Sequence, residues 1–201
     1  MPLEIDQAVE HIQHLDLFEI RGRDNDQRKI LRIVGKHFPA KVVSVESVKK
    51  YLEKYIFPEL EEEPFSIVYF NARVEKKENF PGISALKSIN DAIPVKVRNN
   101  LQAVYFVHPG LHSRLFLATF GRFILTGGLY GKFKYISWLT YLRQHVRRNQ
   151  IEIPEFVQDH DRHLELRPTI EYCLEIEHPR PRCSLIQSDS AFDVYSMRCI
   201  A

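Results

Sequence analysis

Two stretches of the chain are continuously apolar over the length of a β-strand. They are Leu101–Val107, with the sequence LQAVYFV, and residues 65–71, with the sequence FSIVYFN. Neither alternates regularly between apolar and polar positions, a pattern typical of strands that are covered on both faces of a sheet. We therefore expect two buried strands within an α/β fold.

The segment after the strand at 101–107 predicts a helix from residue 111 to residue 125. The turn His108-Pro109-Gly110 ends the strand, because proline cannot donate to a sheet and glycine permits a sharp bend. Apolar side chains point in nearly every direction around this helix. Such a helix is buried in a core, or it lines a lipid-sized cavity or touches a membrane. At about 15 residues it is shorter than the ~20 needed to span a bilayer.

The rest of the pattern alternates strands with helices. Residues 17–21 and 29–36 flank the turn-forming cluster GRDNDQR and predict an antiparallel hairpin, and residues 133–136 predict a short strand. This alternation predicts a mostly parallel sheet with helices packed on it, to which the N-terminal hairpin adds an antiparallel pair. Further helices are expected at residues 44–58, with Ser44 as the N-cap, and at residues 84–92 and 139–148, and residues 151–164 predict a loop and a short helix.

Three segments of different character divide the chain. Residues 1–16 predict a short amphipathic lead-in helix, and residues 17–166 hold the expected α/β domain, in which residues 72–81 are polar and expected to form a loop. Residues 167–201 lack usable periodicity and predict a mobile or peripherally docked tail. All three cysteines, Cys173, Cys183 and Cys199, lie in this tail, which suggests neither a disulfide framework nor a metal site.

Charge is distributed unevenly along the chain, although the formal net charge is only +2. The 60 residues between Asp91 and Glu152 contain no acid and nine bases, so the remainder of the chain is acidic. The basic part coincides with the apolar helix at residues 111–125. Basic charge beside apolar surface favours an anionic lipid headgroup or membrane. Alternatively, these charges are scattered over several faces of the fold and only keep it soluble.

The sequence contains no motif for a common catalytic or phosphate-binding site. There is no GxSxG nucleophile elbow. The glycine-rich segment at residues 127–131 lies between a helix and a strand, which is the reverse of the order in a phosphate-binding loop. No nucleic-acid recognition motif is present. We expect no cofactor, no metal, no nucleic-acid partner and no enzymatic activity.

Two groups of polar residues allow a functional interpretation beside a structural one. His108 ends a buried strand, where ligands of α/β sheets often bind; we expect a structural hydrogen-bonding residue, with a hydrolase using His108 as a distant alternative. The densest group of metal-ligand types is Asp159, His160, Asp161 and His163, which we interpret as surface charges around a helix end.

Several segments carry a resemblance to a known family. They are the hairpin GRDNDQRKILRIVGK, the strand FSIVYFN, and the segments NLQAVYFVHPGLHSRLFLATFGRFI, GKFKYISWLTYLRQHV and IEIPEFVQDHDRHL. Together they resemble the CRAL-TRIO (Sec-fourteen-like) lipid-binding domain of phosphatidylinositol-transfer proteins. They are more similar to the divergent subgroup found in ganglioside-induced differentiation-associated proteins and in Rho GTPase-activating and BCH scaffold proteins. The resemblance covers about residues 17–164.

The resemblance implies a bowl-shaped sheet with an apolar pocket for one lipid chain or other hydrophobic ligand, closed by a mobile gate helix at residues 111–125. The expected pocket lining is Tyr69, Phe106, Leu115, Phe116, Phe120 and Phe123. The expected headgroup or membrane contacts are Arg114, Arg122, Lys132 and Lys134. The expected hinge is Gly127, Gly128 and Gly131.

The function expected from these observations is non-enzymatic binding or transfer of a phospholipid, similar to phosphatidylinositol, or of another hydrophobic ligand. The alternative is a scaffold module of the BCH type that binds a small GTPase or associates with itself. The N-terminus carries no signal-peptide pattern, so we expect a cytoplasmic location with transient contact to anionic membrane surfaces.

Overall fold

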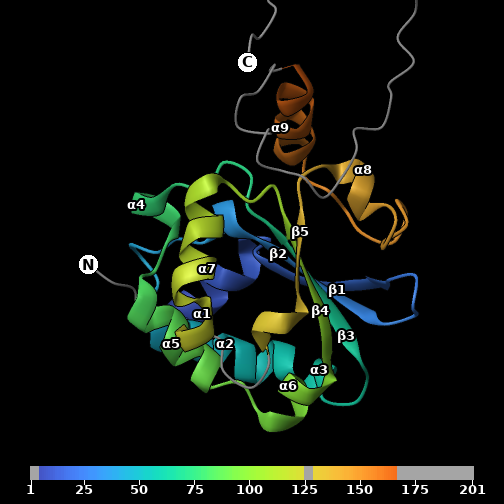
Figure 1. The fold of residues 1–201 in the computed structure, drawn as a ribbon. Helices are drawn as coiled ribbons and strands as arrows, with labels where there is room; N and C mark the ends of the chain where they lie inside the picture. Colours follow the sequence, from blue (N-terminus) through green and yellow to red (C-terminus); the bar gives the residue numbers. More distant parts are fainter. Residues whose placement is uncertain (1–4, 125–128, 167–201) are drawn as a thin grey trace, which may run out of the picture. The chain divides into compact units, whose positions relative to one another are not determined.

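The structure of the protein, a computed structural model, describes residues 5–124 and 129–166. The predicted tail at residues 167–201 and the predicted hinge glycines Gly127 and Gly128 lie outside the described residues. The described residues contain a five-stranded sheet with helices on both sides (Figure 1).

The strands follow one another across the sheet in the order of the sequence. β1 pairs antiparallel with β2, and β2, β3, β4 and β5 are parallel. The α/β fold class, with its N-terminal antiparallel hairpin, is therefore confirmed. The strands are β1 (Phe18–Arg23), β2 (Lys29–Val34), β3 (Phe65–Phe70), β4 (Leu101–Val107) and β5 (Phe133–Ile136).

Two layers of helices cover the sheet (Figure 1). One side is covered by α1 (Ile5–His14), α2 (Val45–Tyr51), the π-helical segment η2 (Leu52–Ile56), α3 (Phe57–Leu60), α5 (Ile83–Asp91), α6 (Val95–Asn100) and α7 (Leu111–Ile124). We call this the α7 side. The other side is covered by α8 (Leu139–Leu142), the turn that follows it and α9 (Glu155–Leu166). We call this the α9 side. The short helices η1 (Gly35–His37), α4 (Lys76–Asn79) and η3 (Leu129–Lys132) lie in connections.

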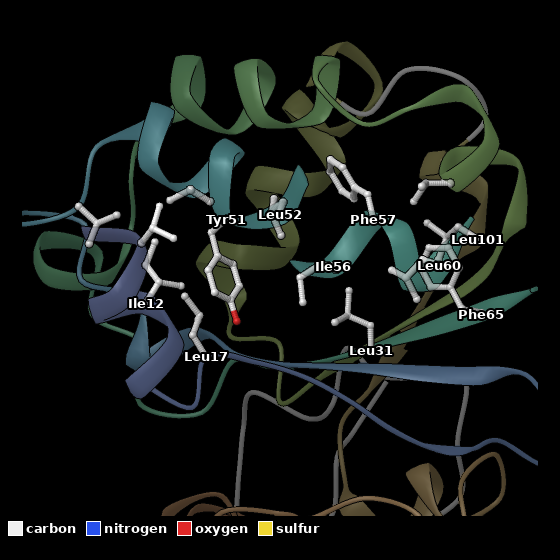
Figure 2. Packing of buried hydrophobic residues seen from close by; sticks show 14 of the residues in the cluster. Ile12, Leu17, Leu31, Tyr51, Leu52, Ile56, Phe57, Leu60, Phe65 and Leu101 are labelled. Atoms are coloured by element: carbon white, nitrogen blue, oxygen red, sulfur yellow. The ribbon is translucent and has the colours of Figure 1, made fainter. Parts of the chain in front are cut away.

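Each side of the sheet has its own hydrophobic cluster. On the α7 side, Ile12, Leu17 and Tyr51 pack with residues such as Leu31 and Phe65 of the sheet, as Figure 2 shows. On the α9 side, strand residues pack against the buried side chains of α8, the turn after it and α9. Since neighbouring residues of a strand point to opposite faces, β3 and β4 contribute to both clusters. This explains why their sequences show no apolar–polar alternation.

The structure differs from the sequence prediction at several helices. The helix that begins with the confirmed N-cap Ser44 does not end at Pro58 but continues to Leu60, because the wider π-helical turns of η2 precede the proline. The helix predicted at residues 139–148 ends at Leu142. Its expected continuation is lost because the backbone N–H and the side chain of Asn25 bind the carbonyls of His145 and Gln144. The helices α4 and α6 were not predicted.

A buried arginine joins the start of the domain to the sheet. Arg32 of β2 is almost fully enclosed and pairs with Asp16, just after α1, and with Glu19 of β1, whose Oε2 lies 2.9 Å from Arg32 Nε. A buried charge requires partners of this kind to offset its loss of hydration. In addition, Val9 and Ile12 of the predicted lead-in helix belong to the hydrophobic cluster on the α7 side of the sheet.

Gly22 allows the hairpin to approach the segment after α8. Its φ is +73°, and it lies in an irregular stretch of the β1–β2 pairing between Ile20 and Arg23. A Cβ atom at Gly22 would lie 1.9 Å from the carbonyl oxygen of Gln150. The neighbouring residue Arg23 donates its backbone N–H to Gln150 Oε1 at 2.9 Å, so the close approach is part of the fold.

We predict that Gly22→Ala lowers the free energy of unfolding by at least about 2 kcal/mol, because it combines a left-handed backbone with a backbone clash. Urea denaturation followed by circular dichroism measures this change. Gly110→Ala is the matched control, since its φ is not positive and nothing lies within 4 Å of the place that an added Cβ atom would take. Its effect should stay within about 0.5 kcal/mol; equal losses for both variants would contradict the prediction.

Candidate functional site

A row of aromatic side chains crosses the α7 side of the sheet near the carboxyl ends of the strands. Tyr69 of β3 stands opposite Phe106 of β4, which stands opposite Tyr135 of β5. The rings of Tyr69 and Phe106 stack with centroids 5.0 Å apart and planes 1° apart. The ring of Tyr135 meets Phe106 edge-on at 6.3 Å. We call these three residues the aromatic row.

The two faces of the sheet are enclosed to different extents at this level. On the α9 side, Val68, Phe70 and Val107 are 0% exposed. On the α7 side, Tyr69 and Tyr135 are only half-buried. Core side chains are normally enclosed by close-packed neighbours. Phe106, at the centre of the row, is buried at 9% exposure, so the helices leave only the two ends of the aromatic row, Tyr69 and Tyr135, incompletely covered.

The hydroxyl end of Tyr69 lies deeper than its exposed surface suggests. A Cβ atom at Gly35 would lie 2.3 Å from this hydroxyl, so only glycine at position 35 allows the approach. Burial raises the pKa of Tyr69 to about 12 because the phenolate would be poorly solvated there. Sequence reasoning missed Gly35, although a glycine that ends an apolar strand is a signal of close approach by another group.

Hydrogen bonds and aromatic contacts hold the first turns of α7 beside the aromatic row. Asn71 Nδ2 donates to the carbonyl of His108 at 3.2 Å and to Ser113 Oγ at 3.3 Å. Arg114 donates from Nη2 to Ser137 Oγ at 3.1 Å, and its guanidinium lies 5.8 Å from the centroid of the Tyr135 ring. Phe116 packs edge-on against Phe80 at 5.6 Å. These contacts hold the N-terminal part of α7 against the carboxyl ends of β3 and β5.

Not all of the predicted pocket residues gather at the aromatic row. Tyr69 and Phe106 belong to it, and Phe116 is half-buried on the inner side of α7. Leu115 is 62% exposed and points away from the sheet, as does Leu111 at 65%. The side chains of Phe120, Phe123 and Arg122 lie outside the described part of the structure. The ligand-binding role of all these residues remains a prediction.

The predicted headgroup residues are separated by the sheet. Lys132 donates to the carbonyls of Arg98 and Leu101, and so links η3 to the start of β4. Lys134 points to the α9 side, where its ammonium group lies 5.5 Å from the centroid of the Tyr105 ring. Arg114 alone of the three described residues lies at the aromatic row. Gly131, the described member of the predicted hinge, is exposed.

His108 has the structural role expected from its sequence. Its φ is +53°, which turns its side chain toward the α9 side. There Nε2 donates to Asp161 Oδ1 at 2.8 Å, and the same oxygen accepts the backbone N–H of Leu139 at 3.0 Å. The imidazole is fully enclosed. A general base must reach substrate or water, so this burial argues against a hydrolase that uses His108.

The predicted surface cluster on α9 is divided by the fold. Asp161 is buried under His108, whereas Asp159 pairs with Arg162 at the surface. His160 packs edge-on against His108 at 5.1 Å, and its pKa is lowered by burial and then by the nearby charges of His108 and Arg73. Among residues 5–124 and 129–166, no group of three or more His, Cys, Asp or Glu side chains could hold a metal ion.

We predict that Asp161→Ala lowers the free energy of unfolding by about 2–4 kcal/mol, because it leaves two buried donors, His108 Nε2–H and Leu139 N–H, without an acceptor. Thermal and urea denaturation measure the loss. Asp159→Ala, on the same helix, removes only a surface ion pair and should cost less than about 1 kcal/mol. A small effect of Asp161→Ala would show that the pair does not hold α9 to the sheet.

Comparison with known proteins agrees with this fold. The model of the divergent CRAL/TRIO domain matches residues 27–163. Ganglioside-induced differentiation-associated protein 2 of Xenopus tropicalis is 32% identical over 140 residues, which cover 70% of this chain and 28% of that protein. The human protein of that name is 29% identical with the same coverage. The GDAP2 homolog of Drosophila melanogaster is 26% identical, and the match covers 70% of this chain and 25% of that protein.

The chain thus spans less than a third of the length of these curated relatives. Within the described ranges, no helix is both long enough and apolar enough to cross a membrane. The family match extends from the turn of the β1–β2 hairpin to α9, and so includes β2 to β5 and the aromatic row. The chain belongs to the divergent CRAL/TRIO domain family, a family of lipid-binding domains that are generally not enzymes.

Proposed function

We propose that this domain binds one hydrophobic ligand, a phospholipid similar to phosphatidylinositol, on the aromatic row beneath α7, and transfers it without chemical change. The observation that carries the proposal is the unequal enclosure of the sheet. Val68, Phe70 and Val107 are sealed on the α9 side, whereas Tyr69 and Tyr135, at the two ends of the aromatic row, remain partly accessible on the α7 side. Apolar surface beneath a helix layer that does not seal it is suited to an acyl chain.

The side chains of the row fit an acyl chain better than a polar ligand. The stacked rings of Tyr69 and Phe106 offer a flat apolar surface, and Ile33 extends it on β2, opposite Tyr69. Burying apolar area contributes roughly 25 cal/mol per Å², so a chain of many methylene groups gains affinity without specific polar contacts. Arg114 lies over Tyr135 at one end of the row, where its guanidinium is suited to an anionic headgroup.

In this proposal α7 acts as a gate that is anchored at its N-terminal end. The contacts of Ser113 with Asn71 and of Arg114 with Ser137 would hold that end while the rest of the helix moves. Leu111 and Leu115 lie one turn apart on the exposed side of α7. Exposed leucines at this spacing are suited to insertion at a membrane interface during ligand exchange. The scaffold alternative, with a small GTPase partner or self-association, remains a prediction.

Phe106→Leu should weaken the binding of a fluorescent phosphatidylinositol by about three- to tenfold, because an aromatic contact beyond simple burial contributes about 0.5–1.5 kcal/mol. Phe70→Leu is the matched control. It changes the sealed α9 side of β3, so it should reduce stability while leaving the affinity of the folded protein unchanged.

Native mass spectrometry of the purified protein tests the proposal as a whole. We expect a retained lipid, or a lipid taken up from liposomes that contain phosphatidylinositol. The proposal is wrong if no lipid is retained or taken up, or if the two phenylalanine variants change the affinity equally.

The double variant Leu111→Ser/Leu115→Ser should reduce sedimentation with anionic vesicles by about fivefold or more, because it removes the two exposed leucines of α7. Val42→Ser/Val95→Ser is the control, since both valines are exposed but belong to other segments of the chain. If the control reduces sedimentation to the same extent, α7 is not the membrane contact.

A further inference from the structure

The fold separates seven of the nine basic residues of the acid-free stretch into two groups. Lys132, Arg98 and Arg114 form hydrogen bonds within the domain, with backbone carbonyls or with Ser137. In contrast, Lys134 of β5 and three arginines in the turn after α8 are exposed. None of these four residues forms an ion pair with an Asp or Glu side chain of residues 5–124 and 129–166. We call Lys134, Arg143, Arg147 and Arg148 the basic surface.

The basic surface lies on the α9 side of the sheet, away from the aromatic row. The ring of His145, in the same turn as the arginines, stacks on Tyr105 at 4.8 Å, and the ammonium group of Lys134 lies 5.5 Å from the centroid of the same ring. Burial and the charge of Lys134 lower the pKa of His145, which reflects their proximity. Lys134 and the turn after α8 therefore meet around Tyr105.

The turn that carries the three arginines is held rigidly by the β1–β2 hairpin. Asn25 donates its backbone N–H to the carbonyl of His145 and its side-chain Nδ2 to the carbonyl of Gln144, both at 2.8 Å. Arg23 binds Gln150 at the other end of the turn, and Val146 between them is buried. A partner would not have to order this backbone on binding, which reduces the entropic cost of association.

The composition of the basic surface identifies the kind of partner that it fits. Every large hydrophobic residue that is strongly exposed in the described structure lies on other elements, so this surface has no side chain to insert into a membrane. The exposed acids Asp26 and Glu152 are paired with Arg28 and Arg21, so the basic surface offers four cations, which suit a short anionic segment better than an extended phosphate backbone. Arginine forks pair well with individual carboxylates.

We propose that the basic surface binds a short acidic segment, rich in Asp and Glu, of a partner protein. Its position on the α9 side allows the segment to bind while a ligand occupies the aromatic row. This interaction does not depend on the proposed lipid-binding function, since the two sites share no residue.

The test measures binding of a fluorescein-labelled octaglutamate peptide to the full chain by fluorescence anisotropy, at 50 and at 200 mM NaCl. Arg143→Gln/Arg147→Gln/Arg148→Gln should weaken binding by about tenfold at the lower salt concentration, since each exposed charge contributes modestly. Wild-type binding should weaken as salt rises. The control Lys76→Gln/Lys77→Gln/Lys87→Gln removes the same charge from exposed positions on α4 and α5 and should change affinity by less than about twofold.

Three outcomes would overturn the proposal. They are no binding at 50 mM NaCl, an equal loss in the control variant, and tighter binding of duplex DNA or phosphatidylserine vesicles through the same arginines. Circular dichroism checks that both triple variants are folded. Uptake of phosphatidylinositol should be unchanged in the arginine variant, so failure here is distinguishable from failure of the lipid-binding proposal.

Discussion

The fold depends on the burial of β4 on both of its faces. A strand without apolar–polar alternation is stable in water only if helices cover both sides of the sheet, and here each side has its own cluster. The two helix layers enclose the sheet to different extents. The α9 side is sealed around Val68 and Val107, whereas the α7 side leaves Tyr69 partly accessible. A ligand site can therefore form on one face without loss of the packing that holds the sheet together.

The carboxyl end of β4 connects the helix layers on the two sides of the sheet. His108 adopts a left-handed backbone conformation that is unfavourable for most residues other than glycine, and this conformation turns its ring toward Asp161 on the α9 side. Its carbonyl meanwhile accepts from Asn71, which also binds Ser113 at the start of α7. A single residue thus lies in a chain of hydrogen bonds from α9 to α7. These hydrogen bonds link the start of α7, on the less enclosed side of the sheet, to the closely packed α9 side.

The sequence predicted the sheet well because burial and β-propensity act locally on strands. β4 and β5 have the predicted bounds, and β3 differs by one residue. The predicted helix at residues 139–148 was too long, since Asn25, which is distant in sequence, binds the carbonyls that would continue α8. At the site, Tyr69 and Phe106 were predicted from the family resemblance, and the register that places their rings side by side on one face was seen only in the structure. The contacts of Lys132 with backbone carbonyls depend on tertiary structure and were not predictable.

The separation of the basic residues follows from the alternation of β5. Phe133 and Tyr135 face the α7 side, so Lys134 between them must face the α9 side. The acid-free stretch is continuous in sequence, yet the sheet divides it between two surfaces of different chemistry. One side presents exposed leucines on α7 and a guanidinium beside aromatic rings; the other presents exposed cations on a rigid turn.

Because the sheet lies between them, an acidic protein segment and a hydrophobic ligand would not compete for the same contacts. Any influence of one on the other would have to pass through β4, β5 and the hydrogen bonds of His108.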